Sequence, residues 1–455
     1  MRAPALRASF DADEMLVDSF AGGGGASTGI AAALDRPVDV AINHDPEAIE
    51  MHRRNHPETQ HYTQDIWTVD PREVCGGRRL GALWASPACT HFSKALGTST
   101  TLNAKIRDLG WVVIDWLRLV RPRALFCENV GEWTTWGPLL ENGRPDKGRS
   151  GEIWRAWLAA IVALGYQVEF RELVAADYGA PTTRKRLYVI ARCDGQPIVW
   201  PEPTHRKSDW VPAHSILDWS LPCRSIFGRR KALAVATEQR IALGLQRFVI
   251  DTPTPFIVRH GHYSTKTGAG LVEGAGAGLF RGQSLGAPLA TVCATNDKHL
   301  VLPVIAKHYG GPNGHQSPGL AVTSPLGAVT AVDHHSLTLA TTQGSHADDV
   351  VAFLTRWNRT GVGSDLRQPV PTITCKPRFG FVRAHVAGGV LRDILMRMLA
   401  MRELYRAQGF PDSYVIDLPG FTQKTQNRLV GNSVCPQVAR ALVAANLLGE
   451  RAVAA

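Results

Sequence analysis

The sequence predicts an α/β fold in which both ends of the chain build one Rossmann-like sheet, with a β-rich domain inserted between them. Apolar runs of strand length occur at residues 15–19, 80–84 and 124–130, and each leads into a turn or a polar residue. Between about residues 200 and 385 the chain is rich in Gly, Pro, Thr and His, with short β-branched runs. These two patterns predict two domains of different architecture.

The first predicted strand leads into a glycine-rich turn. Residues 15–19 are followed by Phe20–Gly25, which reads Phe-Ala-Gly-Gly-Gly-Gly, and then by the helix-forming Ile30–Leu34. Glycines let the backbone approach a ligand closely, and the following helix offers its N-terminus. This arrangement is typical of the nucleotide-binding start of a doubly wound fold. Because the spacing is not GxGxxG, a purely structural turn is an alternative.

A cysteine follows the second apolar run. Cys89 lies in Ala85–Ser93, which reads Ala-Ser-Pro-Ala-Cys-Thr-His-Phe-Ser, directly after Leu80–Trp84. An apolar run that enters a proline turn predicts a buried strand with a loop at the edge of the sheet. A thiol on such a loop can act as a nucleophile if its pKa is lowered. For a cysteine taken alone, a small buried side chain is the alternative.

Further polar motifs follow later predicted elements. The strand at 124–130 contains Glu128 at its carboxyl end, where open α/β sheets place their chemistry. In residues 179–190 a basic turn precedes a strand, and the alternation of side chains places Arg184 and Arg186 on the same side. Apolar spacing predicts helices at the following positions: 106–120, 391–405 and 438–446.

Taken in order, these motifs resemble the DNA (cytosine-5) methyltransferases. The motifs are Phe20–Gly25, Pro87-x-Cys89, Glu128–Val130, Arg184-x-Arg186, Gln408–Asp412 and Gly431–Val434. The resemblance covers about residues 15–192 and 392–446, and the sequences around Cys89 and at Asn43–Ala48 are most similar to phage and prophage members. It implies a class I methyltransferase sheet with an inserted target-recognition domain. The implied parts are a tail at 1–14, a catalytic domain at 15–195, the recognition domain at 196–388 and a returning segment at 389–455.

The resemblance implies transfer of a methyl group from S-adenosylmethionine to carbon 5 of cytosine in duplex DNA. Cys89 would add to carbon 6 of the base and thereby make carbon 5 nucleophilic. Glu128 would protonate or hydrogen-bond ring nitrogen 3 and the exocyclic amine. Arg186 would hold the carbonyl oxygen of the base or lower the pKa of Cys89, with Arg184 nearer the backbone. Because the target is stacked in the duplex, the base would be flipped out.

The resemblance also implies which residues contact the cofactor. Phe20 would flank the adenine, the glycines would admit the methionine end, and Asp65 would reach the adenine amine. The full implied set is Phe20, Gly22, Gly24, Gly25, His44, Asp45, Asp65, Ile66, Pro87, Asn432 and Ser433. The chain departs from the family pattern at three positions: Ala88 replaces a proline, Thr182 replaces a glutamine, and His44 stands where a ribose-binding glutamate is expected, which leaves Asp45 to bind the ribose.

Composition is consistent with this prediction. With 455 residues and 44% hydrophobic content the chain can bury a large core, and a net charge of +10 favours a polyanionic partner over a basic enzyme without one. The eight cysteines form no CxxC pair, which argues against a zinc site or disulfides. His52 and His56 stand at helical spacing, and without a third ligand we expect a solvated helix face and no metal.

The sequence also carries expectations about location and assembly. It contains no apolar run of membrane-spanning length and no leader, so we expect a protein of the cytoplasm, of a bacterial cell or a phage-infected host. We expect it to act as a monomer on duplex DNA, without a membrane partner. Two alternatives remain: a tRNA cytosine-5 methyltransferase, which the large central domain disfavours, and a DNA-binding relic without turnover.

The central region contains a pattern that recurs three times. The copies are Pro288–Leu300, Pro325–Leu337 and Pro369–Phe381, and each predicts an alternating strand, a polar turn and another apolar position. Such repeats suggest stacked β-hairpins. They occupy the place of the recognition domain, which favours DNA readout over a plain scaffold. The predicted DNA contacts, with two in the loop after Cys89 that would close over DNA, are Ser93, Lys94, Asn296, Lys298, His299, His335, Lys376 and Arg378.

Overall fold

The computed structural model separates the chain into two compact units. The first comprises Met1–Asp218, Arg367–Pro377 and Ala400–Ala455, and the second comprises Trp219–Leu366 and Arg378–Leu399. The structure describes residues 11, 13–88, 108–231, 256–259, 282–284, 298–307, 320–321, 335–341, 349–356, 368–373, 379–387 and 390–448. For most residues of the strands between 256 and 396, the structure describes the backbone and not the side chains. The domain boundaries expected at 195 and 389 stay predictions.

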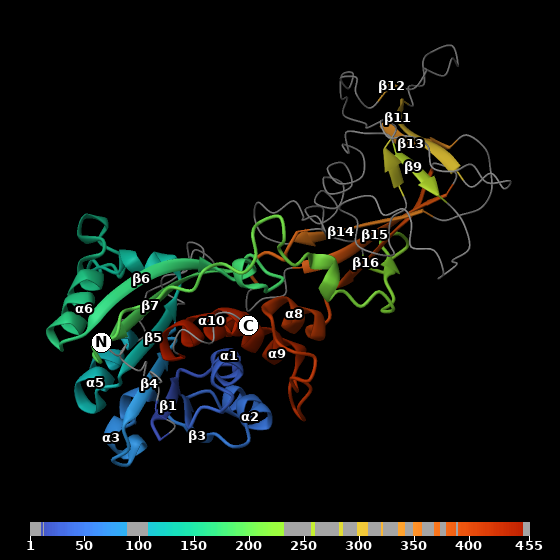
Figure 1. The fold of residues 1–455 in the computed structure, drawn as a ribbon. Helices are drawn as coiled ribbons and strands as arrows, with labels where there is room; N and C mark the ends of the chain where they lie inside the picture. Colours follow the sequence, from blue (N-terminus) through green and yellow to red (C-terminus); the bar gives the residue numbers. More distant parts are fainter. Residues whose placement is uncertain are drawn as a thin grey trace, which may run out of the picture. The chain divides into compact units, whose positions relative to one another are not determined.

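The first unit contains a seven-stranded sheet (Figure 1). Its strands, in spatial order, are β3 (Gln60–Thr63), β2 (Val40–Asn43), β1 (Met15–Ser19), β4 (Leu80–Ala85), β5 (Ala124–Asn129), β7 (Lys185–Arg192) and β6 (Gln167–Val174). The first five run parallel, whereas β7 is antiparallel to both of its neighbours. The predicted α/β fold is thus confirmed, and the carboxyl ends of β1 to β5 meet at one edge.

Helices cover both faces of this sheet (Figure 1). The helices of the first unit are α1 (Gly25–Leu34), α2 (Pro46–Asn55), α3 (Pro71–Cys75), α5 (Leu109–Val120), α6 (Glu152–Ala163), α8 (Met401–Gln408), α9 (Gln423–Asn432) and α10 (Pro436–Leu447). Short 3-10 turns lie between them: η1 (Ile66–Thr68), η3 (Gly131–Thr135), η4 (Lys147–Arg149), η5 (Ala175–Tyr178) and η6 (Ala213–Ile216). Within the described residues, none of the helices has the length and hydropathy needed to cross a bilayer.

The core lies on the two faces of β4, which is buried along its whole length. Because side chains alternate along a strand, Leu83 packs with Trp116 of α5 on one face, whereas Trp84 packs with Ile30 of α1 and Val438 of α10 on the other. The C-terminal helix α10 therefore completes the layer that the N-terminal helix α1 begins. The two ends of the chain form one core.

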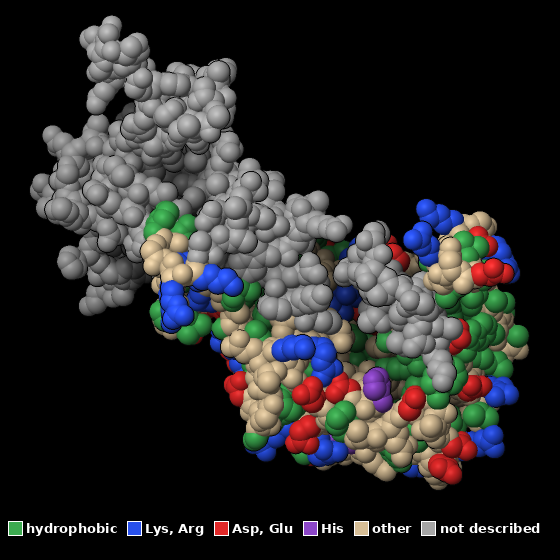
Figure 2. All heavy atoms as spheres, turned by 180° about the vertical axis from the view of Figure 1, so that it is seen from behind, with side chains coloured by type: hydrophobic (Ala, Val, Ile, Leu, Met, Phe, Trp, Pro, Cys, Tyr) green, Lys and Arg blue, Asp and Glu red, His purple; other side chains and the backbone are tan. Residues whose placement is uncertain are grey.

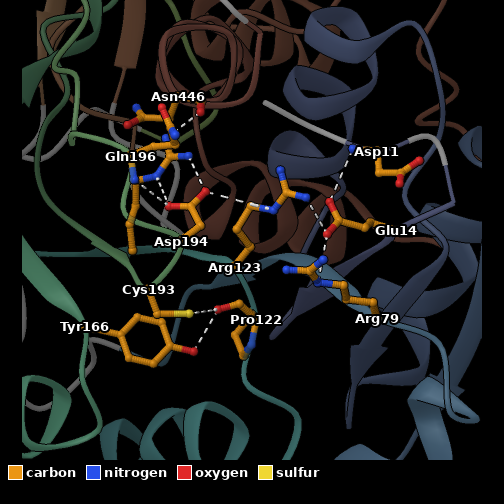
Figure 3. A network of polar contacts seen from close by, with 11 residues as sticks. Asp11, Glu14, Arg79, Pro122, Arg123, Tyr166, Cys193, Asp194, Gln196 and Asn446 are labelled. Atoms are coloured by element: carbon orange, nitrogen blue, oxygen red, sulfur yellow. Dashed lines mark hydrogen bonds and ion pairs between the residues drawn. The ribbon is translucent and has the colours of Figure 1, made fainter. Parts of the chain in front are cut away.

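A polar network fixes α10 to the end of the sheet opposite the carboxyl ends of the parallel strands (Figure 3). Glu14, which is 2% exposed, accepts a hydrogen bond from Arg123 at 2.6 Å. Arg123 Nε lies 3.9 Å from Asp194 Oδ2, and Arg192 donates to that same oxygen at 2.6 Å. Arg192 also donates to the backbone oxygen of Asn446 at 2.5 Å. Buried charges are thus paired with one another and with the last turn of α10.

The second unit is built of β strands. Its sheet has the order β10-β9-β11-β13-β16-β15-β14, with β12 added to β11 and β8 added to β16. The strands are β8 (Arg224–Ser225), β9 (Phe256–Arg259), β10 (Gly282–Ser284), β11 (Lys298–Lys307), β12 (Leu320–Ala321), β13 (His335–Thr341), β14 (Asp349–Arg356), β15 (Phe379–Ala387) and β16 (Val390–Met398). The pairs along this path are antiparallel.

Two predictions about these later segments are wrong. The helix expected at 391–405 is strand β16 up to Met398, because β16 pairs with β15 along its length, and helix α8 begins only at Met401. The strand expected at the start of the third repeat does not form within residues 369–373, the described part of that start. Val370 makes a single bridge to Thr182 and is completely buried in the first unit. The strand regions of the first two repeats lie mostly outside the described residues.

Candidate active site

The site lies where the order of the parallel strands reverses. Strands β1 and β4 are neighbours, and the chain leaves β1 toward β2 on one side and β4 toward β5 on the other. In open α/β sheets ligands bind at this switch point, outside the carboxyl ends of the strands. The glycine-rich loop follows β1, the segment Ser86–Ala88 follows β4, and Glu128 lies near the end of β5. The switch point therefore collects the predicted motifs.

Glu128 is a buried carboxylate between two arginines. It is 7% exposed, and its Oε1 lies 3.3 Å from Arg186 Nε and 3.6 Å from Arg184 Nη2. Within the part of the chain that the structure describes, this oxygen accepts no hydrogen bond. Buried polar atoms are normally hydrogen-bonded, so Glu128 Oε1 is a candidate for contact with a ligand. The strand pairing of β5 with β7 produces the cluster, because Glu128 stands opposite Tyr188, two residues from Arg186.

Arg184 also reaches the C-terminal part of the first unit. Its Nη1 donates to the backbone oxygen of Gly431 at 3.0 Å, and the backbone oxygen of Ile373 lies 3.5 Å away. Arg186 instead donates to the backbone oxygen of Lys185 at 2.7 Å. The turn before Arg184 is held by Val370, which accepts from the Thr183 amide at 2.8 Å. Arg184 thus links the buried carboxylate to segments nearly 250 residues later.

Cys89 lies outside the described residues, as do Ser93 and Lys94, but the chain leading to Cys89 is well anchored. The Ser86 amide donates to Ser19 at 3.3 Å, and the Trp84 indole donates to the Ser86 hydroxyl at 2.9 Å. The side chain of Asn129, which follows Glu128, donates to the Pro87 backbone oxygen at 3.1 Å. Asn129 was not among the predicted site residues. It fixes the segment two residues before Cys89 beside the carboxylate cluster.

The glycine-rich loop has a backbone that few other residues could adopt. Phe20 itself has a left-handed φ of 63°, which is uncommon for a non-glycine residue. Gly24 has a φ of 80°, and a Cβ there would lie 2.1 Å from the Tyr414 hydroxyl. At Gly25 a Cβ would lie 2.0 Å from the Val434 backbone oxygen, whereas at Gly22 it would meet open space. Packing on the C-terminal segment therefore requires Gly24 and Gly25, whereas among the described residues nothing lies within 4 Å of a Cβ at Gly22.

The loop after β2 is occupied by protein contacts. Asp45 caps α2, accepting from the Glu47 amide at 3.0 Å, and its other oxygen is paired with Arg428 of α9. Burial acts to raise the pKa of Asp45, but the hydrogen bond and charge of Arg428 outweigh it and lower the pKa. His44 is exposed beside it. The sequence predicts that Asp45 binds the ribose in place of a glutamate. The carboxylate that would do so is already paired with Arg428.

Asn43, overlooked in the sequence, links this loop to the glycine-rich loop. Its amide donates to the Ala21 backbone oxygen at 2.8 Å, and its side-chain oxygen accepts from the Asp45 amide at 2.9 Å. Asn43 is the last residue of β2, so it lies at the carboxyl edge of the sheet. An amide side chain at the end of a buried apolar strand was the available signal.

The remaining predicted cofactor residues come from two other elements. Asp65 is exposed and caps η1, with Ile66 buried behind it. Ser433 is buried, and its hydroxyl donates to the Leu429 backbone oxygen at 2.8 Å, whereas Asn432 at the end of α9 is exposed. Gln408 of α8 donates to the Ser433 backbone oxygen at 2.6 Å. These contacts fix the C-terminal motif to its neighbours in the first unit. They do not assign a ligand to it.

A chain of buried polar groups runs beneath the glycine-rich loop. The Ser27 hydroxyl donates to Asp18 at 2.7 Å, His52 Nε2 lies 2.9 Å from Ser27 Oγ, and His61 Nε2 lies 2.8 Å from His52 Nδ1. The expectation of a solvated histidine face is wrong, because His52 is fully buried against α1. Among the described residues, no cluster of three or more side chains has the arrangement of a metal site.

These buried polar groups, together with His56 beside His52, predict how the stability of the fold depends on pH. Burial raises the pKa of Asp18 to about 7, and burial lowers the pKa of His56 to about 4. Between pH 4 and 7 the raised Asp18 pKa makes stability fall as the pH rises, whereas the lowered His56 pKa makes it rise. We expect Asp18→Asn to remove the first effect, so that the variant loses stability more steeply on acidification. Urea denaturation of Asp18→Asn and, as the opposite control, His56→Gln at several pH values tests this; curves parallel to wild type would contradict it.

Comparison with known proteins identifies the family. The family model described as C-5 cytosine-specific DNA methylase matches residues 15–218 and 339–447, more than half of the chain. The protein therefore belongs to the C-5 cytosine-specific DNA methylase family, as its sequence motifs predict.

Curated relatives match parts of this chain. It is 29% identical over 215 residues to the type II methyltransferase M.SacI of Streptomyces achromogenes, covering 42% of this chain and 50% of the relative. The rice DNA (cytosine-5)-methyltransferase 1A is 24% identical over 469 residues, covering 94% of this chain and 28% of the relative. The chain thus spans half or less of these relatives. The solved structure of the Entamoeba histolytica methyltransferase EhMeth superposes with a TM-score of 0.49 at 12% identity, covering 96% of this chain and 98% of that one.

Proposed function

We propose that this protein transfers a methyl group from S-adenosylmethionine to carbon 5 of cytosine in duplex DNA. One observation supports it most directly: the buried Glu128 carboxylate lies between Arg184 and Arg186, and the neighbouring Asn129 holds Pro87 beside it. This geometry suits a base that must be bound along its polar edge while the Cys89 thiolate attacks the ring. Membership of the family supplies the reaction class.

The chain's own residues account for the proposed chemistry. The Cys89 thiolate forms a bond to carbon 6, and negative charge then develops at ring nitrogen 3 and carbon 5. Glu128 protonates or hydrogen-bonds nitrogen 3 and so offsets that charge. Arg186 binds the carbonyl oxygen of the base, and Arg184 holds Glu128 in place. Carbon 5 then forms a bond to the methyl group of the donor, whose carbon–sulfur bond breaks to leave S-adenosylhomocysteine. A base removes the carbon 5 proton, and the electron pair of that C–H bond re-forms the double bond between carbons 5 and 6 as the bond to Cys89 breaks. The base must be flipped out of the duplex for this contact.

The switch point fits S-adenosylmethionine as the donor, which supplies an electrophilic methyl group. Gly22 faces open space, while Asp65 and His44 are exposed at the ends of neighbouring strands. We propose that Phe20, Ile66 and Pro87 line the same place. Asn432 and Ser433 would close it from the C-terminal segment. Gly24 and Gly25 would shape the loop, and Asp45 would contribute by capping helix α2 beside the site.

We further propose that the second unit contacts DNA. Of its predicted contacts, Lys298 and His299 begin β11, whereas His335 begins β13 and pairs with Lys307 at the other end of β11. At a rise near 3.4 Å per residue, these two groups lie about 30 Å apart, so they would contact different parts of a duplex. Asn296, Lys376 and Arg378 lie outside the described residues. Figure 2 shows Lys and Arg side chains in separate groups among acidic ones on the described surface in view.

The decisive experiment is mass spectrometry of nucleosides from unmethylated, GC-rich duplex DNA incubated with the protein and S-adenosylmethionine. We expect 5-methylcytosine to accumulate in the duplex and not in a transfer RNA offered in parallel, and bisulfite sequencing of the same sample gives the target site. Methylation of the RNA alone would favour a tRNA methyltransferase. Unchanged cytosine in both, with DNA binding intact, would contradict the proposed activity and favour a binding protein without turnover.

A further inference from the structure

The glycine-rich loop is held by a side chain from the opposite end of the chain. Tyr414 follows α8 in a turn in which its amide donates to the Pro411 backbone oxygen at 3.0 Å. Its side chain is 4% exposed, and its hydroxyl donates to the Gly23 backbone oxygen at 2.7 Å across 391 residues of sequence. This contact directly joins the C-terminal segment to the loop in which we place the methyl donor.

The contact fixes the direction of a peptide group in the loop. In a planar trans peptide the carbonyl and the following amide point in opposite directions. Because Tyr414 binds the Gly23 carbonyl, the amide of Gly24 is directed away from the Tyr414 hydroxyl. The next carbonyl, of Gly24, accepts from both the hydroxyl and the backbone amide of Thr28, at 2.7 and 2.9 Å, and these bonds direct the Gly25 amide in the same manner. These two amides begin helix α1, where unpaired amide groups attract a negatively charged ligand group.

The loop cannot keep this conformation by itself. Gly24 has a left-handed φ of 80°, and consecutive glycines have large conformational freedom in an unrestrained chain. A Cβ on Gly24 would lie 2.1 Å from the Tyr414 hydroxyl, so the tyrosine packs directly against the loop. Tyr414 therefore supplies both a hydrogen bond and a surface on which the glycines rest.

We infer that Tyr414 is a positioning residue for the methyl donor: by holding the Gly23 carbonyl, it preorganises the loop amides that bind S-adenosylmethionine. The inference rests on the proposed function, because it assigns Tyr414 to the cofactor loop of that reaction. Preorganisation raises affinity by removing the cost of ordering the loop on binding. Loss of the hydroxyl should then weaken cofactor binding and leave the chemical step unchanged.

Tyr405 offers a matched control. It is also completely buried, and its ring lies 6.4 Å from that of Tyr414 in the same aromatic cluster. Its hydroxyl, however, contacts the Gln426 backbone oxygen at 3.3 Å and Met51 Sδ at 3.2 Å, with neither contact in the glycine-rich loop. Tyr405→Phe therefore removes a buried hydroxyl from the same region without releasing the loop.

The experiment compares Tyr414→Phe, Tyr405→Phe and wild type in full-length form. Calorimetry gives the Kd for S-adenosylhomocysteine, and steady-state kinetics give the KM for S-adenosylmethionine and kcat. We expect Tyr414→Phe to raise the Kd and the KM about five- to tenfold, the effect of one hydrogen bond, with kcat at saturation within about twofold of wild type. Tyr405→Phe should leave all three within about twofold. Hydrogen exchange of the peptide covering residues 20–27 should increase only in Tyr414→Phe.

The outcomes separate this inference from the proposed function. Wild type that binds no S-adenosylhomocysteine would contradict the proposed function and the cofactor role of Tyr414 with it. Binding by wild type that Tyr414→Phe leaves unchanged, or that Tyr405→Phe weakens equally, would contradict the inference alone. If Tyr414→Phe does not fold, hydrogen exchange of the wild type provides the second measurement: S-adenosylhomocysteine should slow exchange in the peptide covering residues 20–27, and binding without this protection would overturn the inference.

Discussion

Replacing Cys89 by serine is expected to abolish methyl transfer while the protein still folds and binds DNA. The hydroxyl of serine ionises far less readily than a thiol, so the variant has no anion that can add to carbon 6. Loss of the nucleophile in an enzyme that works through a covalent intermediate costs on the order of 10⁶ in kcat. Because Asn129 anchors Pro87 two residues earlier, the substitution should not displace the loop from Glu128.

Two measurements check this expectation. Incorporation of a radiolabelled methyl group reports turnover, and a duplex in which fluorine replaces the hydrogen on carbon 5 reports the adduct, since elimination is then blocked. Wild type should form a covalent protein–DNA complex and Cys89→Ser should form none. Cys193→Ser is the control, because Cys193 donates to Pro122 at 3.4 Å at the opposite end of the sheet, and it should keep full activity. Normal turnover by Cys89→Ser would refute the covalent mechanism.

The parts of the fold that were predictable from the sequence depend on local patterns. Strands β1, β4 and β5 each begin with an apolar run and are followed by, or end in, one of the predicted site motifs. Parallel strands of this kind predict that Glu128 and the glycine-rich loop lie at the same edge of the sheet. Partnerships between distant segments were not predictable. Residues 391–398 have helical apolar spacing but form β16, because β15 is available to pair with it. Tertiary pairing overrides local propensity there.

The same limit applies to the site. Arg184 and Arg186 were expected to face one side, yet their common partner Glu128 depends on antiparallel β7 lying next to β5. The state of Asp45 depends on Arg428, which comes 383 residues later. His52 is buried because Ser27 and His61 approach it from different elements, and neither contact leaves a local signal. The sequence showed which residue types lie at the strand ends. It did not show which side chains from distant segments contact them.

Replacing Glu128 by glutamine is expected to slow the chemical step by about 10²- to 10⁴-fold, with little change in the KM for S-adenosylmethionine. Glutamine has nearly the same shape, so the buried pocket should remain filled. It cannot transfer a proton to ring nitrogen 3, and it leaves the charges of Arg184 and Arg186 without the carboxylate that lies 3.6 and 3.3 Å from them. Single-turnover kinetics with preformed protein–DNA complex measure this step separately from binding.

The control for charge loss is Glu172→Gln. Glu172 lies on β6, is exposed, and pairs with Lys185 at 2.5 Å, so its loss removes a carboxylate beside the same strand β7 without touching the buried cluster. Surface ion pairs contribute at most about 1 kcal/mol, and this variant should therefore keep wild-type rates.

A Glu128→Gln rate within tenfold of wild type would show that the carboxylate only balances the two arginines. An equal loss in both variants would point to electrostatics along β7. A large loss in Glu128→Gln alone would support the assignment of Glu128 as the group that binds the polar edge of the base.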